Sequence, residues 1–162
     1  MEIIDSTLIT LGVLTRLKET YTLNWNGLHG FPHWVRVRNN GLKLASLNAA
    51  DSRIVEWFAF FHDIKRKNDG ADWLHGPRAS QWIRDTFSEW IDLEPAALDL
   101  LCEACAGHTG GSNHPNLTVR TCWDADRLDL YRVGTKPNPK YLCTEEARKT
   151  DIIAWAMQNS VL

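Results

Sequence analysis

The chain has 162 residues, of which 44% are hydrophobic and 23% are charged, and its formal net charge is −2. This length is that of one ordinary globular domain, and the composition excludes a disordered chain. The near-neutral charge gives no sign of the broad basic surface that non-specific nucleic-acid binding uses. No apolar run approaches the roughly 20 residues that a bilayer-spanning helix needs. We therefore expect a single domain over residues 1–162, with neither a membrane span nor an extended nucleic-acid surface.

The first residues and the cysteines bear on the compartment. Glu2 and Asp5 precede the first apolar stretch, where a secretory signal peptide carries basic residues. We therefore expect a cytoplasmic protein whose four cysteines are free thiols. Cys102 and Cys105 form a CxxC motif, but it lies within a predicted helix and lacks the second pair of ligands that a zinc ribbon needs. Packing in the core is the better interpretation of these cysteines.

Apolar residues recur at three- and four-residue spacing in nearly every segment, whereas no alternating run typical of a strand exceeds a few residues. This pattern predicts an all-α fold, a compact bundle of about seven helices. Pro77 is compatible with the pattern because it falls in a first helical turn, where its missing N–H costs nothing. The predicted helices span about residues 6–18, 33–47, 51–65, 75–90, 94–106, 119–131 and 144–159.

A histidine and an aspartate, His62 and Asp63, follow the most apolar stretch of the chain, IVEWFAFF. Burying an imidazole and a carboxylate without partners costs on the order of several kcal/mol, so both side chains need partners in the fold. Two interpretations satisfy this requirement. The pair is either a hydrogen-bonded structural element or a pair of metal ligands.

Further polar residues stand at the ends of neighbouring predicted helices. His33 begins one helix, His75 begins another, His108 follows a third, and the segment TCWDADRLDL carries Asp124 and Asp126. In an antiparallel helix array, residues at alternating starts and ends gather at one end of the bundle, and helical bundles build metal sites in this way. The sequence therefore favours the metal-site interpretation.

The order of these residues resembles the signature of the HD superfamily, an all-helical group of metal-dependent phosphohydrolases. The similarity covers about residues 30–134 and includes the segments HWVRVRNNG, AFFHDIKR, HGPRAS, AGHTGG and ADRLD. It leaves an N-terminal and a C-terminal helix as flanking elements. The resemblance implies that one divalent ion is held by His33, His62, Asp63 and a distal aspartate.

The distal aspartate has two candidates. In the family the last ligand lies in an Ala-Asp dipeptide on a helix, which here is Ala125-Asp126, so Asp126 is preferred and Asp124 is the alternative. Side chains two positions apart on a helix point about 200° apart, so the two aspartates do not easily face one ion.

The resemblance leaves open how many ions bind. Two imidazoles and two carboxylates suit Mn²⁺, Mg²⁺, Fe²⁺ or Zn²⁺. His75 and His108 either hold a second ion, with Asp63 bridging the two ions, or contact the phosphate of a substrate. Arg66 stands where some HD enzymes carry a lysine, and a guanidinium there is suited to clamp phosphate; the alternative is a solvated arginine in a charged loop. Asp63 and Arg66 are therefore the predicted catalytic residues.

We predict a divalent-metal-dependent phosphohydrolase, a phosphatase or phosphodiesterase, that acts on a phosphoester or phosphoanhydride such as a nucleotide or a related small molecule. Two alternatives stay open, an HD-fold di-iron oxygenase and a noncatalytic nucleotide-binding module. The expected partner is a phosphorylated small molecule. The C-terminal helix lies outside the similarity and is expected either to cover the core or to mediate a homodimer.

Overall fold

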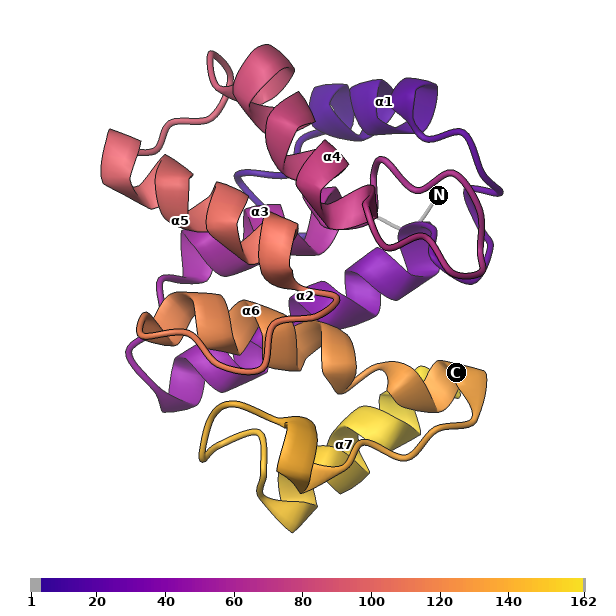
Figure 1. Ribbon diagram of the computed structural model, residues 1–162, viewed down its shortest axis with the longest axis vertical. Coiled ribbons are helices and arrows are strands. Elements are labelled where there is room, and N and C mark those ends of the chain that lie inside the picture. Colours follow the sequence, from indigo (N-terminus) through magenta and orange to yellow (C-terminus); the bar gives the residue numbers. More distant parts are fainter. Residues whose placement is uncertain (1–3, 162) are drawn as a thin grey trace.

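The computed structural model describes residues 4–161, which form helices and loops without any strand (Figure 1). The predicted all-α fold of about seven helices is confirmed over these residues, and the predicted helix 75–90 is divided between an α-helix and a short π-helix. The α-helices are α1 (Leu11–Thr20), α2 (Phe31–Leu47), α3 (Ser52–Phe61), α4 (His75–Trp82), α5 (Pro95–Gly107), α6 (Leu117–Arg127) and α7 (Thr150–Ser160), and the short segments are the π-helix η1 (Ile83–Phe87) and the 3₁₀-helices η2 (Leu130–Val133) and η3 (Pro139–Tyr141).

Helix α3 lies at the centre of the main hydrophobic core. Every residue from Ile54 to Phe61 is buried. Helices α2, α5 and α6 all pack against α3, so its side chains contact neighbours on every side rather than along one stripe. The buried Glu56 is paired with Arg38, whose Nε donates to Glu56 Oε1 over 2.9 Å. Because α3 is buried along this length, its C-terminal end lies in the interior. The polar residues that directly follow it, His62 and Asp63, are therefore also buried.

A second, smaller hydrophobic cluster joins the C-terminal helix to the rest of the protein. Ile152, Ile153 and Ala156 of α7 pack with Leu44 of α2 and with Leu128, which directly follows α6. In Figure 1, α7 lies beside the segment that follows α6 and at the opposite end of the molecule from α1. The C-terminal helix therefore covers part of this chain's own core, which is one of the two roles expected of it.

Two helices begin later than the periodicity predicts. Helix α1 begins at Leu11 rather than near Ser6, because the Thr10 hydroxyl accepts a hydrogen bond from a backbone N–H of the first turn and caps the helix. Helix α7 begins at Thr150 rather than at Thr144, because Thr144 is bound to a buried carboxylate of α6 described below. In both cases a side-chain hydrogen bond, which periodicity does not report, sets the start.

Helix α3 ends earlier than predicted, at Phe61. Beyond it the backbone tightens into turns, in which the Ile64 N–H donates to the Phe61 carbonyl and the Arg66 N–H donates to the Asp63 carbonyl, over 3.2 and 3.1 Å. His62 and Asp63 therefore lie in a buried turn and not on the helix itself.

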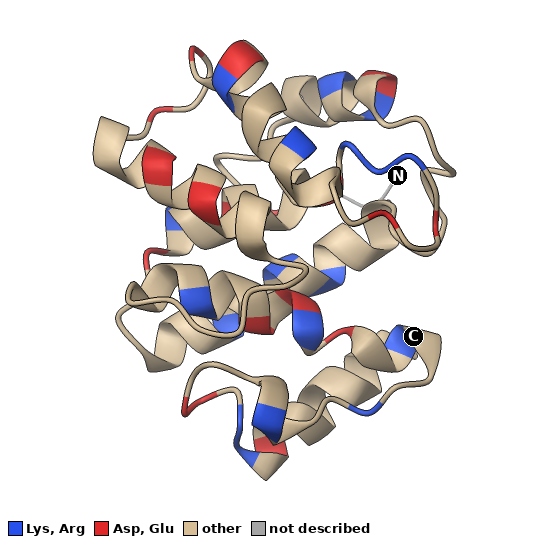
Figure 2. Ribbon diagram, in the orientation of Figure 1, with Lys and Arg blue, Asp and Glu red and all other residues tan. Residues whose placement is uncertain are grey.

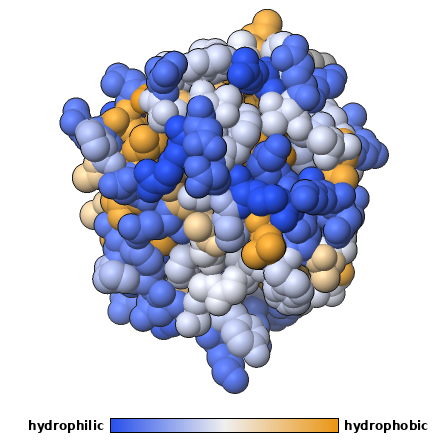
Figure 3. All heavy atoms as spheres, turned by 45° about the horizontal axis from the view of Figure 1, so that its top comes forward, coloured by the Kyte–Doolittle hydropathy of each residue, from blue (hydrophilic) through white to orange (hydrophobic). Residues whose placement is uncertain are grey.

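Acidic and basic residues are interspersed along the helices rather than separated onto different parts of the fold (Figure 2). In the space-filling view of Figure 3, apolar side chains form small separate groups on a mainly hydrophilic face. Among the described helices, none combines the length and the hydrophobicity that crossing a membrane requires.

Candidate metal centre

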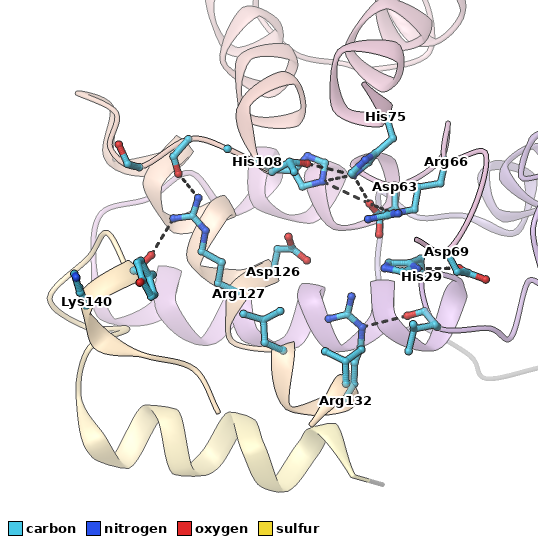
Figure 4. A pocket seen from close by; sticks show the side chains of 18 residues that line it. His29, Asp63, Arg66, Asp69, His75, His108, Asp126, Arg127, Arg132 and Lys140 are labelled. Carbon is cyan, nitrogen blue, oxygen red and sulfur yellow. Dashed lines mark hydrogen bonds and ion pairs between the residues drawn. The ribbon is translucent and has the colours of Figure 1, made fainter. Parts of the chain in front are cut away.

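Six of the predicted residues converge at one place, where the ends of five helices meet. His33 lies in the first turn of α2, His62 and Asp63 directly follow α3, His75 begins α4, His108 directly follows α5, and Asp126 lies in the last turn of α6. Five of these residues are buried, and the sixth, Asp126, has a side chain that is 20% exposed. Helix ends bring the six side chains into one interior space, where Figure 4 shows four of them, Asp63, His75, His108 and Asp126.

Three of these side chains form a first group, His33, His62 and Asp126. The Nε2 atoms of His33 and His62 lie 3.2 Å apart. Asp126 Oδ1 lies 3.2 Å from His33 Nε2 and 3.6 Å from His62 Nε2. Two imidazole nitrogens and a carboxylate oxygen thus face one small volume, which is an arrangement able to hold a metal ion.

The other three side chains form a second group, His75, His108 and Asp63. The Nε2 atoms of His75 and His108 lie 2.8 Å apart. Asp63 Oδ1 lies 3.0 Å from His75 Nε2 and 3.5 Å from His108 Nε2. The other oxygen, Asp63 Oδ2, lies 3.4 Å from His62 Nε2 and 3.6 Å from His33 Nε2 in the first group. The Asp63 carboxylate therefore lies between the two groups and offers one oxygen to each.

All four histidines are oriented by a hydrogen bond at Nδ1. His33 Nδ1 lies 2.6 Å from Asp129 Oδ2, and His108 Nδ1 lies 2.7 Å from the Cys105 carbonyl oxygen. His62 Nδ1 lies near the last carbonyl oxygens of α3, and His75 Nδ1 lies near a carbonyl oxygen of the preceding loop. These acceptors place the proton on Nδ1 and leave the Nε2 lone pair of each ring directed at the centre.

The six residues fit a pair of divalent ions. Two Nε2 lone pairs that face each other across about 3 Å repel, so a proton or a metal ion must lie between them. Two ligand atoms that each bind one ion at about 2.1 Å and at right angles are themselves about 3 Å apart, as His33 Nε2 and His62 Nε2 are here. Nitrogen and carboxylate ligands of this kind suit Mn²⁺, Fe²⁺ and Zn²⁺, and Mg²⁺ less well.

The electrostatics of the centre also favour positive charge. Burial by itself lowers the pKa of His62, but Asp63 and Asp126 outweigh burial and raise this pKa to about 10. Burial also raises the pKa of Asp63, yet His62 and His108 outweigh it and hold the pKa of Asp63 well below its usual range. Burial raises the pKa of Asp126 as well, but His33 and His62 outweigh burial and hold this pKa well below its usual range. Both carboxylates are therefore ionised at neutral pH and favour a cation at the centre.

The close approach of α4 and α5 depends on a glycine. A Cβ atom at Gly76 would lie 2.5 Å from the Cys105 carbonyl oxygen and 3.3 Å from His108 Nδ1. Because Gly76 has no side chain, the start of α4 packs directly against the end of α5. This contact brings His75 and His108 within reach of each other.

One functional candidate was not singled out from the sequence. Asp129 is fully buried and binds His33 Nδ1, and its other oxygen accepts from Arg36 Nε over 2.8 Å. Burial raises the pKa of Asp129, but His33 and Arg36 outweigh it and lower this pKa. The spacing contains a signal for it, since Asp129 follows Asp126 by three positions and so lies on a similar face of the helical turn.

The alternative distal aspartate, Asp124, faces away from the centre. It is buried, and its carboxylate accepts hydrogen bonds from the Cys143 amide over 2.7 Å and from the amide and hydroxyl of Thr144 over 2.8 and 2.7 Å. Asp124 thus anchors the loop before α7, while Asp126, on another side of the same helix, faces His33 and His62. The geometry leaves Asp126 as the distal candidate.

Arg66 lies beside the centre rather than free in the loop. Its Nε donates to Asp63 Oδ1 over 3.3 Å, and its Nη1 donates to the carbonyl oxygens of Asn68 and Gly70. The guanidinium therefore orients Asp63 and holds the loop that follows it, and the remainder of the group lines a cavity.

This cavity, of about 580 Å³, opens directly over the centre (Figure 4). Asp63, His75, His108 and Asp126 lie at its base. Its walls carry both basic and apolar side chains, which are Arg66, Arg127, Arg132, Lys140, Leu28, Leu130, Val133 and Tyr141. The candidate metal ligands are thus accessible to a small molecule.

His29, which sequence patterns favour as an exposed loop residue, is buried and lines the cavity. Its Nδ1 lies 2.8 Å from Asp69 Oδ1, and its carbonyl oxygen accepts a hydrogen bond from Trp34 Nε1 over 2.7 Å. Figure 4 shows the ring edge opposite Asp69 turned toward the cavity. Burial lowers the pKa of His29, although Asp69 acts in the opposite direction, so the ring is neutral at pH 7.

Comparisons with known proteins agree with this architecture. No protein-family model matches the sequence, and no curated protein matches it. Among solved structures, the chain is similar to a predicted HD superfamily hydrolase from an uncultured Thermotogales bacterium, with 23% identity and a TM-score of 0.71 over 94% of this chain and 87% of the other. At this identity the likeness establishes the fold. The chain therefore shares the all-helical fold of that protein, whose description agrees with the resemblance of the residue pattern.

Proposed function

We propose that this protein is a metal-dependent phosphohydrolase with two divalent ions, acting on a small phosphoester or phosphoanhydride such as a nucleotide. One observation carries the proposal. The Asp63 carboxylate directs Oδ1 to His75 and His108 and Oδ2 to His33 and His62, at the base of an open cavity. A carboxylate shared between two imidazole groups is the arrangement expected of a bridging ligand in a binuclear site.

The charge of the ligand set favours an anionic substrate. When the four imidazoles bind metal they are neutral, so the ligand set carries only the two negative charges of Asp63 and Asp126, which is less than the positive charge of two divalent ions. With two ions bound, the bottom of the cavity would carry a net positive charge, which attracts a phosphate group. Arg66 and Arg132 on the cavity wall add to this attraction.

The wall also suits a substrate with an organic part. Leu28, Val133 and Tyr141 line the cavity and are exposed. Lys140, which directly precedes Tyr141 in η3, adds a positive charge to the cavity lining. A phosphate group at the base and a flat or apolar group at the mouth would together fill a cavity of about 580 Å³.

Divalent ions bound at this centre would polarise a phosphoryl oxygen and lower the pKa of a coordinated water. The chain's own residues supply orientation and proton transfer. His29, with its proton held on Nδ1 by Asp69, presents Nε2 to the cavity and is suited to take a proton from water or from a substrate group. Arg66 keeps Asp63 in place and offers its remaining N–H groups to phosphate oxygens.

One further observation supports the proposal. The similar solved protein carries the description of a predicted HD superfamily hydrolase, which supports hydrolysis as the reaction class.

The test is elemental analysis of the wild type beside Asp63→Asn, together with a phosphate-release screen on mono-, di- and cyclic nucleotides with Mn²⁺. Asp99→Asn is the matched control, because Asp99 is an exposed carboxylate paired with Arg84 on the surface. We expect about two metal equivalents and turnover in the wild type and the control, and loss of both in Asp63→Asn. A wild type that binds no divalent metal, or full activity in Asp63→Asn, would contradict the proposal.

Other outcomes of the same experiment identify the alternatives. About one equivalent with turnover would assign His75 and His108 to substrate phosphate. Bound iron with O₂ consumption and without phosphate release would indicate a di-iron oxygenase. Tight nucleotide binding without turnover would indicate a noncatalytic binding module.

A further inference from the structure

The hydrogen bonds around Asp129 extend from the metal centre to the C-terminal helix. Asp129 Oδ2 accepts the His33 Nδ1 proton over 2.6 Å. Asp129 Oδ1 accepts from Arg36 Nε and from the Ser160 hydroxyl, both over 2.8 Å. Asp129 is fully buried, so each of these partners contributes to holding its charge in the interior. A continuous path therefore joins Ser160, the last residue of α7, to a candidate metal ligand.

The Ser160 hydroxyl has two acceptors within reach, Asp129 Oδ1 at 2.8 Å and the Ala156 carbonyl oxygen at 3.0 Å. A hydroxyl has one proton to donate, and a bond to an ionised carboxylate is the stronger of the two. Ser160 therefore donates to Asp129. Ser160 and Arg36 together hold Asp129 Oδ1 in place and so set the orientation of the carboxylate. This orientation sets the position of Oδ2, which accepts from His33.

Helix α7 is packed through its own hydrophobic cluster, separate from the main core. The cluster joins Ile152, Ile153 and Ala156 of α7 to Leu44 and Leu128. Elements held by small, separate contact sets open more easily than those in the main core. Opening of α7 would therefore disrupt fewer apolar contacts than opening of a helix of the main core, and it would separate the Ser160 hydroxyl from Asp129.

We propose that Ser160 is a positioning residue through which the docking of α7 orients His33 and sets the affinity of the first metal group. This inference rests on the proposed function, because it requires that the centre binds divalent metal. Coupling between two sites is reciprocal, so metal binding at His33 in turn stabilises the docked position of α7. Helix α7 is therefore part of the metal site, although it lies outside the segment that resembles the HD signature.

The first experiment compares the Mn²⁺ affinity of the wild type, Ser160→Ala and Asp129→Asn by calorimetry. Gln158→Ala is the matched control, since Gln158 is an exposed residue of the same helix. We expect one of the two binding events to weaken by about 3- to 10-fold in Ser160→Ala, by about 10- to 100-fold in Asp129→Asn, and not at all in the control. Thermal unfolding of the metal-free proteins separates this effect from general destabilisation.

If the wild type binds Mn²⁺ and Ser160→Ala binds it equally tightly, or loses only thermal stability, the inference is wrong while the proposed function stands. If the wild type binds no metal, the proposed function itself fails.

A second measurement uses the unmodified protein. Hydrogen exchange of the amides in residues 150–160 should slow on addition of Mn²⁺, whereas exchange in α1, at the opposite end of the molecule, should not change. In Ser160→Ala the metal-dependent slowing in α7 should be reduced. Exchange in α7 of the wild type that does not respond to bound Mn²⁺ would overturn the coupling.

Discussion

His75 Nε2 and His108 Nε2 lie 2.8 Å apart, although both rings carry their proton on the other nitrogen, where a backbone carbonyl accepts it. Two lone pairs at this distance are stable only with positive charge between them or beside them. The Asp63 carboxylate does not supply that charge, since it too is an acceptor and lies 3.0 Å from His75 Nε2. This juxtaposition is the clearest sign that the centre is built for cations.

Gly76→Ala should weaken the second group selectively. The added Cβ would lie 2.5 Å from the Cys105 carbonyl oxygen, so the start of α4 must move away from α5. We expect loss of about one metal equivalent and destabilisation by about 1–3 kcal/mol, measured by elemental analysis and thermal unfolding.

The matched control for this change is Gly12→Ala. Gly12 is likewise the second residue of its helix, but its added Cβ would meet only Thr10 Oγ1, at 3.8 Å. Metal content should be unchanged there and stability should rise by about 0.5–1 kcal/mol. Equal metal content in both variants would show that the α4–α5 contact does not position His75.

Asp126→Asn and Asp124→Asn should separate metal binding from folding. Asp126→Asn removes the charge that faces His33 and His62, so we expect Mn²⁺ affinity to fall by more than about 100-fold with little change in the stability of the metal-free protein. Asp124→Asn places an amide against the donors of Cys143 and Thr144, so we expect destabilisation by about 1–3 kcal/mol with metal affinity retained. Calorimetry and denaturant unfolding measure the two effects, and the reverse pattern would make Asp124 the distal ligand.

His29→Ala should lower kcat by about 10²- to 10⁴-fold without changing metal content. The expectation follows from the cavity-facing position of His29 and from its bond to Asp69, which orients the ring. His114→Ala serves as the control, because His114 pairs with Glu103 on the surface, away from the cavity lining. Steady-state kinetics with the best substrate of the screen, beside elemental analysis, checks both variants. Normal turnover in His29→Ala would exclude its role in proton transfer.

The same histidine gives a prediction on pH. Burial lowers the pKa of His29 in the folded protein below the ordinary value of 6.5, so the unfolded chain takes up this proton first as the pH falls. His29 therefore reduces the stability of the folded state as the pH drops below about 6.5 and has no such effect above it. In the presence of a chelator, the free energy of unfolding of wild type should fall more steeply between about pH 7.5 and 5.5 than that of His29→Gln. Parallel curves would show that His29 titrates normally.

The residue pattern alone predicts the all-α class, most helix positions and the set of polar residues worth testing. Apolar spacing of three and four residues is a local property, and so is the position of a histidine at a predicted helix end. This local pattern is enough to indicate His33, His62, Asp63, His75 and His108 as candidates. Their meeting in space follows from the fold, since α2, α3, α4 and α5 bring these ends together.

Other features depend on contacts between distant segments. The preference for Asp126 over Asp124 is decided by which side of α6 faces the histidines and which side faces Thr144. His29 is buried in the fold, and Asp69, 40 positions away, bonds to its ring. Ser160 meets Asp129 across 31 positions, in a helix that the signature does not include. Local periodicity reports how a residue is placed on its own helix, whereas these contacts depend on how helices pack, and packing is set by the whole chain at once.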